Sequence, residues 1–434
     1  MDRETKVKDK KKKKNETNLP EGWKRVRLRE VIEIFDNQRI PLDSEYRSTI
    51  KGYIPYCGAT GVIDYINDYI FDGEYVLIAE DGGKFNRFEE TAYIMMGKFW
   101  ANNHVHIVRG KDGTLDDSFL MYSVNYQDIS YYISGSTREK LNQQLLKSVV
   151  IILPPLPEQH KIAEILETVD NAIEKTGRII EKYKRIKQGL MQDLLTRGIV
   201  ESDELGVMSY ELRDEKKHRF KDSPLGRIPE EWEVVELGEV VESFAGGTPN
   251  RENKEFFSGS IKWLKSGEIN RKYIYDTEEK ITMKGFKFSS TKWIERNTVV
   301  IALYGATAGQ VGIVKDKMTM NQAVLALNTF KNKLNYEYIY YYLSAYVPKI
   351  LSQLQGSGQP NLSKKIIDTI QIPLPPLPEQ HRIASILSQI DEAIEKEQEY
   401  KEKLERIKRG LMEDLLTGKV RVLGVMNYEL GVKS

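Results

Sequence analysis

A stretch that occurs twice constrains the fold more than any other feature of this chain. Residues 153–166 read LPPLPEQHKIAEIL and residues 374–387 read LPPLPEQHRIASIL, which differ at two of fourteen positions. Residues 189–196 and 410–417 differ at one of eight, and both pairs of stretches are 221 residues apart. The segment between the matched stretches therefore has the same length in both copies. Such a repeat indicates the architecture before local propensities are considered.

Each copy has the pattern of a long amphipathic helix. Pro157 and Pro378 suit a first helical turn, and Glu158 and Glu379 place negative charge at the positive end of the helix dipole. Apolar residues then recur mostly in steps of three and four, which is typical of a coiled-coil seam. The predicted seam consists of Ile162, Leu166, Val169, Ile173, Ile180, Tyr183, Ile186, Leu190 and Leu194 in the first copy, and of Ile383, Leu387, Ile390, Ile394, Leu404, Ile407, Leu411 and Leu415 in the second.

Both helices have a predicted end and a predicted partner. Gly198 and Gly418 follow the periodic stretches where a C-terminal cap glycine belongs. Each helix should then span roughly 38 residues, or roughly 57 Å. A parallel and an antiparallel pair would both cover the apolar seams. We expect the antiparallel pair, because it closes a duplicated chain on a pseudo-twofold axis.

Composition bounds the class of protein. The 434 residues suffice for two to four domains, and no apolar run approaches the roughly 20 residues that span a bilayer. The N-terminal residues lack the apolar core of a signal peptide, and the single cysteine, Cys57, excludes an internal disulfide. We therefore expect a cytoplasmic protein with no membrane association. The formal net charge is +1, so any nucleic acid would be bound through local patches or with a more basic partner.

The repeat also includes a globular domain before each helix. Residues 19–35 match residues 228–244, with Trp23 aligned to Trp232, and both stretches predict a strand followed by a short helix. The interiors differ much more, and their short strands and Gly-rich turns predict an α+β protein with two α/β domains and twisted sheets. The predicted order is a lysine-rich disordered tail (1–17), a first domain (18–155), a first helix (156–198), a linker (199–224), a second domain (225–376), a second helix (377–418) and a tail (419–434).

Signatures of catalysis and of cofactors are missing from the sequence. It has no P-loop, no Asn- or Asp-Pro-Pro-Tyr/Phe motif of an amino-methyltransferase, and no Cys/His spacing for zinc. His104 and His106 could lie on one strand face, but ordinary sheet histidines are the better interpretation. The pairs Glu80-Asp81 and Glu89-Glu90 could suggest a nuclease, yet solvated loops are favoured. We predict no catalytic residue, no metal and no cofactor.

With these constant ends and divergent interiors, the chain resembles the specificity subunit of type I restriction–modification enzymes over nearly its whole length. LPPLPEQ before a long helix occurs twice, and residues 221–232 (KDSPLGRIPEEW) and 356–362 (GSGQPNL) match the opening and closing of the family's domains. Residues 135–141 (GSTREKL) depart from the closing pattern, which suggests a different target or a different backbone contact in the first domain.

The resemblance implies a role in DNA recognition. Each target-recognition domain would read one half of a bipartite sequence in double-stranded DNA, and the paired helices would set the spacer between the halves. The helices would also dock two methyltransferase subunits, and the complex could recruit ATP-dependent restriction subunits. Two other classes remain open: a stand-alone DNA methyltransferase or nuclease, and a coiled-coil scaffold with no DNA role.

Polar residues of the Gly-rich loops are the candidates for base contacts. Arginine favours guanine, and asparagine or glutamine favours adenine, in the major groove. Any one of these residues is more often an ordinary loop residue, so the prediction concerns the group. The candidates are Thr60, Lys84, Asn86, Arg87 and Asn102 in the first domain, and Lys265, Ser266, Asn270, Arg271, Thr307, Gln310, Asn321 and Gln322 in the second.

Overall fold

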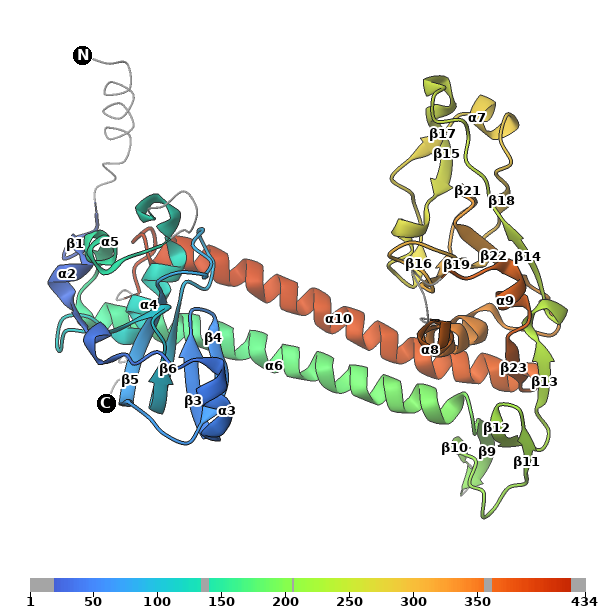
Figure 1. Cartoon of the computed structure of the whole chain (residues 1–434), viewed down its shortest axis with the longest axis horizontal. Helices are drawn as coiled ribbons and strands as arrows, with labels where there is room; N and C mark the ends of the chain where they lie inside the picture. Colours follow the sequence, from blue (N-terminus) through green and yellow to red (C-terminus); the bar gives the residue numbers. More distant parts are fainter. Residues whose placement is uncertain (1–18, 134–139, 205–206, 355–360, 423–434) are drawn as a thin grey trace, which may run out of the picture. The chain divides into compact units, whose positions relative to one another are not determined.

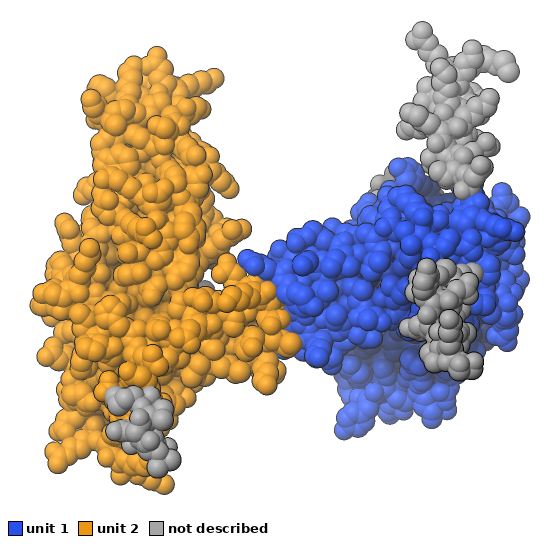
Figure 2. Space-filling model, turned by 180° about the vertical axis from the view of Figure 1, so that it is seen from behind, with its two compact units in different colours: residues 1–178, 398–434 blue, residues 179–397 orange. Residues whose placement is uncertain are grey.

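The computed structural model describes residues 19–133, 140–204, 207–354 and 361–422. The lysine-rich tail, most of the GSTREKL and GSGQPNL stretches and the last twelve residues lie outside this part. The chain forms two compact units: unit 1 contains residues 1–178 and 398–434, and unit 2 contains residues 179–397 (Figure 2). No helix among the described residues is long and apolar enough to cross a membrane.

The two predicted long helices are present and have equal lengths. Helices α6 (Leu156–Leu194) and α10 (Leu377–Leu415) each contain 39 residues (Figure 1). In unit 1, Nζ of Lys408 on α10 lies 2.5 Å from Oδ1 of Asp170 on α6. In unit 2, Nζ of Lys187 on α6 lies 2.5 Å from Oδ1 of Asp391 on α10. Lys187 follows Asp170 by 17 residues and Lys408 follows Asp391 by 17, so the pairing is antiparallel and has the same register in both units.

The first domain is built on one six-stranded sheet. Strand β1 (Lys24–Arg27) pairs with β8 (Val150–Leu153), and the predicted short helix follows as α2 (Leu28–Val31). The sheet has the order β2 (Ile32–Ile34), β7 (Val105–Gly110), β5 (Phe71–Ala79), β6 (Ala92–Ala101), β3 (Lys51–Gly58) and β4 (Gly61–Ile66). Helix α4 (Asp117–Tyr126) packs on β5 and β6, and short helices α3 (Ser44–Thr49) and α5 (Gln143–Ser148) lie outside the sheet.

The second domain repeats the ends of the first with a different interior. Strand β13 (Glu233–Glu236) pairs with β23 (Gln371–Leu374), as β1 pairs with β8. The interior has a five-stranded sheet of β14 (Val241–Ala245), β22 (Val324–Thr329), β19 (Val299–Ala302), β20 (Val311–Val314) and β16 (Tyr273–Ile274), and a four-stranded sheet of β17 (Lys280–Ile281), β15 (Phe257–Leu264), β21 (Met318–Met320) and β18 (Trp293–Ile294). Helix α8 (Tyr336–Leu354) corresponds to α4, and α7 (Met283–Lys287) and α9 (Lys364–Asp368) are short.

The predicted linker between α6 and the second domain contains regular secondary structure. It contains the hairpin of β9 (Ile199–Glu204) with β10 (Val207–Leu212). A second hairpin, β11 (Phe220–Ser223) with β12 (Gly226–Pro229), crosses the predicted boundary between residues 224 and 225. The polar composition of this segment concealed the hairpins, because two-stranded ribbons can expose most of their side chains.

The ends of the long helices belong to the domain cores. In unit 1, Ile162 and Leu166 from the start of α6 pack with Leu415 from the end of α10, and unit 2 repeats this with Ile383, Leu387 and Leu194. Ile180 and Leu404 are buried as predicted seam residues. The prediction is wrong for Ile186 and Ile407, because these side chains remain 38% and 42% exposed. The remaining seam positions are half-buried: Val169, Ile173, Tyr183, Leu190, Ile390, Ile394 and Leu411. Each domain therefore packs against the start of one long helix and the end of the other.

Candidate nucleic-acid interface

A buried glutamate joins the first domain to its helix. The Glu158 carboxylate accepts hydrogen bonds from Trp23 Nε1 (3.0 Å) and from Nε and Nη2 of Arg421 (2.8 and 2.9 Å). Trp23 belongs to the loop before β1, and Arg421 follows the end of α10. One carboxylate therefore connects a domain, the start of one long helix and the segment after the other.

The second domain uses the same arrangement. Glu379 accepts from Trp232 Nε1 (3.1 Å), from the backbone N–H of Ile199 (2.9 Å) and from both terminal nitrogens of Arg213. A Cβ on Gly198, which has φ of +64°, would lie 2.2 Å from the Glu379 carboxylate, so only glycine fits beside it. We call these two sites the Glu–Trp–Arg clamps.

Only some residues of the Glu–Trp–Arg clamps can be recognised in the sequence. The tryptophans and glutamates recur at matched positions, which was a usable signal, but we assigned the glutamates only to the helix dipole. The arginines could not be found in this way, because Arg213 lies 15 residues after Gly198 and Arg421 only three after Gly418. The neighbouring Gln159 and Gln380 bind backbone groups of the loops before α4 and α8.

Three loops of the first domain are held together by backbone hydrogen bonds. The N–H of Asn102 donates to the carbonyl of Cys57 (3.0 Å), and the N–H of Glu80 donates to the carbonyl of His104 (2.9 Å). These bonds bring together the β3–β4 turn with Thr60, the loop after β5 with Lys84, and the turn after β6. The candidates that lie far apart in the sequence therefore come from adjoining loops.

A network of polar side chains around His106 supports these loops. His106 is buried, with Nδ1 2.6 Å from Asp36 Oδ2 and Nε2 2.6 Å from the Leu141 carbonyl. Burial raises the pKa of Asp36, but the bonds from His106 and from the Ile107 N–H, together with the charge of Arg39, outweigh burial and hold this pKa below its ordinary value. His106 is therefore a satisfied sheet histidine, and no metal-binding cluster occurs in the described ranges.

The carboxylate pair Glu80-Asp81 is engaged in the same network. Glu80 accepts from Arg39 Nη1 at 2.7 Å and pairs with Lys140 Nζ at 2.9 Å, while Asp81 Oδ1 lies 2.6 Å from Nδ1 of His104. Burial raises the pKa of Glu80, but the two cations hold it below its usual value. Glu80 and Asp81 are buried, so the prediction of a solvated loop is wrong for this pair. Their partners position the loop after β5, which is a structural role.

The candidate residues of the first domain fall into two groups. Asn86 binds Glu89 through its side chain (3.1 Å), Arg87 binds Tyr126 and Glu413, and Asn102 is buried and accepts the N–H of His104 (2.8 Å). Thr60 and Lys84 are exposed and make no side-chain hydrogen bond or ion pair within the described part of the chain. The free donors of Thr60 and Lys84 fit a DNA contact best, and base contact by the whole group stays a prediction.

Loops of the second domain also converge. β15 and β21 run parallel, and the N–H of Asn321 donates to the carbonyl of Leu264 (2.9 Å), so Lys265 and Ser266 lie beside Asn321 and Gln322. The hydroxyl of Thr248 bonds the Gln322 side chain. Thr248 was not predicted, although the Gly246-Gly247 pair before it marked a loop.

The candidate residues of the second domain divide in the same way. Burial lowers the pKa of Lys265, but ion pairs with Glu278 and Glu279 outweigh it and raise this pKa above its ordinary value. The Asn321 side chain accepts the N–H of Ala323 (3.0 Å). Five candidates make no side-chain hydrogen bond or ion pair among the described residues: Ser266, Asn270, Arg271, Thr307 and Gln310.

Asn270 and Arg271 line a cavity of about 500 Å³ in unit 2. Three carboxylates, Glu268, Asp276 and Glu278, line the same cavity. Arg271 therefore lies among carboxylates, which repel phosphate groups.

Comparison with known proteins identifies the family. A model described as "Type I restriction modification DNA specificity domain" matches residues 20–184 and 229–406, once for each half of the repeat. The chain belongs to this specificity-domain family. The sequence resemblance is thereby confirmed, and so are the two-domain α+β fold and the paired long helices that it implied.

Similar specificity proteins extend over almost the whole chain. Two subunits from Methanocaldococcus jannaschii, the putative MjaX and the MjaVIII specificity subunits of type I restriction enzymes, are each 29% identical to it over 93% of its length and cover 95% and 94% of their own. The type I restriction–modification S subunit of M. genitalium has the same fold, with a TM-score of 0.62, 16% identity and coverage of 93% of this chain and 98% of its own.

A second solved structure has the same fold. It comes from work on complex assembly and conformational transition of the type I restriction–modification system, and it matches with a TM-score of 0.54 and 18% identity over 93% of this chain and 100% of its own.

Proposed function

We propose that this chain is the non-catalytic DNA-reading subunit of a type I restriction–modification complex. Each domain reads one half of a bipartite double-stranded target, and α6 and α10 set the distance between the halves. One observation carries the proposal: two different loop surfaces are mounted on two copies of the same Glu–Trp–Arg clamp. A specificity subunit whose DNA target varies while its partner subunits stay the same needs variable loops on a constant frame.

The chemistry of the loops supports DNA as the ligand. Lys84 and Arg271 keep uncommitted cationic side chains in the described structure, and Thr60, Asn270 and Gln310 offer donors and acceptors for base edges. The small net charge means that part of the positive charge around the DNA would come from partner subunits.

We further propose that two methyltransferase subunits dock on the long helices. Two copies of one partner need two equivalent surfaces, and the helices offer them: Ile186 and Gly189 on α6 recur as Ile407 and Gly410 on α10. Both isoleucines are exposed, and a Cβ on either glycine would meet nothing within 4 Å. Each pair forms an uncovered apolar notch where another helix could approach closely.

Mapping of methylated bases in DNA tests the function directly. We expect host cells that express the chain with its cognate methyltransferase to carry methylation at a two-part asymmetric motif, and cells without the chain to lack it. Replacing residues 241–370 by the interior of a related second domain should change only one half of the motif. Methyl transfer by the purified chain with S-adenosylmethionine alone, or hydrolysis of DNA by it with Mg²⁺, would instead support a stand-alone enzyme. A methylation motif that persists in cells without the chain would contradict both the DNA-reading function and the stand-alone enzyme.

A further inference from the structure

Unit 2 contains a groove of about 980 Å³ that has no role in the proposed function. A stripe of α6 from Lys184 to Gln192, with helical spacing over roughly 12 Å, lines the groove and continues into Leu195 and Thr196 just after the helix. Residues of α8 from Tyr342 to Lys349 also line the groove. The hairpin β11–β12 contributes Ile228. Along α6 and the two residues after it, the groove extends over about three helical turns, which is long enough for about three turns of another helix.

The floor and the rim of the groove differ in chemistry. Leu195 and Ile228 are buried parts of the floor, and Tyr342 stacks on Tyr346 with a ring-centroid distance of 5.4 Å. The rim carries Lys184, Lys187 and Lys349. Lys187 pairs with Asp391, the single carboxylate that lines the groove, at 2.5 Å, and Lys184 pairs with the exposed Glu181 at 2.8 Å, whereas Lys349 makes no ion pair within the described part of the chain. An apolar floor beneath a cationic rim is complementary to an amphipathic segment with acidic residues beside its apolar face.

The equivalent position in unit 1 is filled by the chain itself. Helices α4 and α8 can be aligned because the backbone N–H groups of Asp116 and Asn335 before them donate to Gln159 and Gln380, both at 2.9 Å. In this alignment Ala345 corresponds to Tyr126, and the long helices align Gln192 with Glu413.

In unit 1 these larger groups close the space. The Tyr126 hydroxyl donates to Glu413 at 3.0 Å. Arg87 bonds both residues, and its guanidinium carbon lies 4.4 Å from the Tyr126 ring centroid and 4.8 Å from that of Phe88. Unit 2 has the small Ala345 here, and α8 runs two turns beyond the point where α4 ends. Among the described residues, the groove is therefore open in unit 2 and filled in unit 1, although the frame around it occurs in both units.

We propose that this groove binds one amphipathic helix with an acidic face, contributed by a protein partner at one copy per chain. Its binding is separate from the two equivalent docking surfaces proposed above, because only unit 2 leaves the groove open. The apolar face of the helix covers Leu195, Ile228 and Tyr342, and its carboxylates reach Lys184 and Lys349. The inference does not depend on DNA recognition.

A fluorescent peptide of about 14 residues, with leucines at helical spacing and glutamates on the flanking positions, is the probe for this groove. Titration of the full chain, followed by fluorescence anisotropy and by calorimetry, should give one site per chain with a Kd of about 100 µM or lower. A peptide with lysines in place of the glutamates and a scrambled peptide are the controls. We expect the lysine peptide to bind at least about tenfold more weakly.

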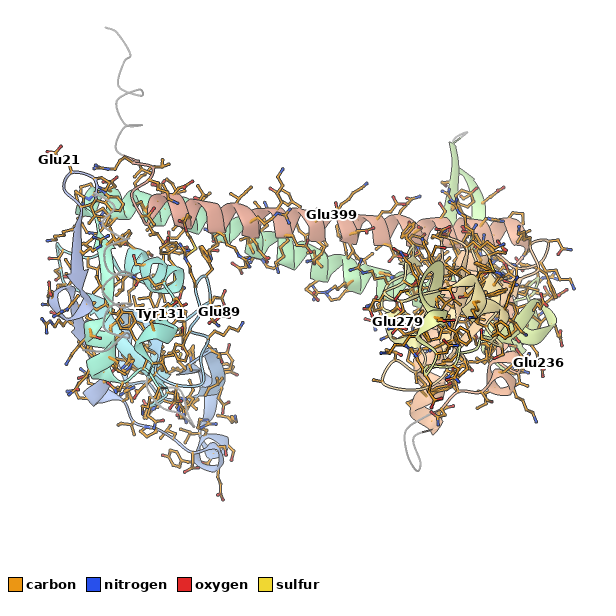
Figure 3. All side chains as sticks on the ribbon, turned by 90° about the horizontal axis from the view of Figure 1, so that it is seen from above. Glu21, Glu89, Tyr131, Glu236, Glu279 and Glu399 are labelled. Atoms are coloured by element: carbon orange, nitrogen blue, oxygen red, sulfur yellow. The ribbon has the colours of Figure 1, made fainter. Side chains whose placement is uncertain are left out.

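Two substitutions test whether the peptide lies in the groove. Ala345→Tyr introduces the side chain that fills this position in unit 1 and should weaken binding by at least about tenfold, as should Lys184→Glu with Lys349→Glu. The matched control is Tyr131→Ala, an exposed residue of unit 1, which should leave binding unchanged (Figure 3). Circular dichroism and thermal unfolding confirm that each variant is folded.

Three results would overturn the inference. They are no binding of the acidic peptide up to about 1 mM, equal binding of the acidic and basic peptides, and full affinity in the folded Ala345→Tyr variant. Displacement of the peptide by duplex DNA, together with weaker DNA binding by Ala345→Tyr, would instead assign the groove to nucleic acid. The methylation motif measured in the same Ala345→Tyr strain distinguishes these results from failure of the proposed DNA-reading function.

Discussion

At the scale of single residues, the Glu–Trp–Arg clamps differ in how deeply their arginines are buried. The Arg213 side chain is 6% exposed, whereas that of Arg421 is 34% exposed and keeps part of its hydration. Glu379→Gln should lower the free energy of unfolding by about 2 kcal/mol, because the buried Arg213 guanidinium loses the carboxylate that binds both of its terminal nitrogens and keeps only the half-exposed Glu231. Glu158→Gln should lower it less. Denaturant unfolding measures both, with Glu399→Gln on the exposed face of α10 as the control (Figure 3). Equal losses would contradict the role of burial.

A second residue-scale prediction concerns Asp117, the first residue of α4. Burial and the nearby Glu74 and Asp116 raise its pKa to about 6, although the Gly110 N–H and Arg109 oppose this shift. The folded state therefore holds a proton more tightly than the unfolded chain, whose Asp has a pKa of about 3.9. The contribution of Asp117 to stability should rise as pH falls through 6 towards 4. Asp117→Asn keeps an oxygen for the Gly110 N–H and should remove this part of the pH dependence in thermal unfolding between pH 7 and 5. An unchanged profile would show that Asp117 does not cause it.

At the scale of elements, the long helices are joined by one tyrosine–aspartate–lysine contact in each unit. Asp170 accepts from Tyr122 (2.7 Å) and pairs with Lys408, whereas Asp391 accepts from Tyr341 (2.5 Å) and pairs with both Lys187 and Lys272. Lys408→Met should therefore cost more stability than Lys187→Met, because Asp391 keeps a second cation. A double-mutant cycle with Asp170→Asn should give a coupling of about 1 kcal/mol. A coupling of zero would mean that the pair contributes nothing to helix pairing.

The open helical glycines give a second prediction at this scale. Alanine at Gly189 or Gly410 would meet no atom within 4 Å, so each substitution should stabilise the free chain by about 0.5–1 kcal/mol through helix propensity. The same substitutions should weaken binding of the methyltransferase subunits, since the added methyl groups fill the proposed notches. Thermal unfolding and titration with purified methyltransferase measure the two effects. Stabilisation without any loss of binding would place the docking surfaces elsewhere.

At the scale of the whole molecule, helix length should determine the spacer between half-sites. Deleting residues 175–181 from α6 and 396–402 from α10 removes one heptad from each helix and preserves the antiparallel register. Each helix would shorten by roughly 10 Å, so the spacer in the methylated motif should change by about three base pairs. Both half-sites should remain the same. Methylation mapping reads out all three parts of the motif, and an unchanged spacer in an active variant would contradict the ruler.

Local patterns were sufficient to predict much of this architecture. The seam, the initial prolines and the later glycines predicted helices of roughly 38 residues, and 39 are found in each. The matched tryptophans marked the repeated start of each domain, where β1 and β13 occupy the same place. These features are visible in sequence because periodicity, capping and repetition depend only on residues close together in the chain.

Other features depended on contacts between distant residues. The pattern could not show that Glu379 binds Arg213, 166 residues away, or that Ile186 stays exposed. Nor could it show that Arg87 and Asn102 use their side chains for contacts within unit 1. It also could not show that Ala345 and Tyr126, on aligned helices, leave one groove open and close the other.

The repeat in the amino-acid sequence thus specified the frame, namely two domains and two long helices of matched length, because helical periodicity is a local property. Tertiary packing decided which polar side chains are used within the fold and which remain available to a ligand. The reason is physical: a donor or carboxylate is free or satisfied according to the groups that folding brings beside it, and those groups come from distant parts of the chain.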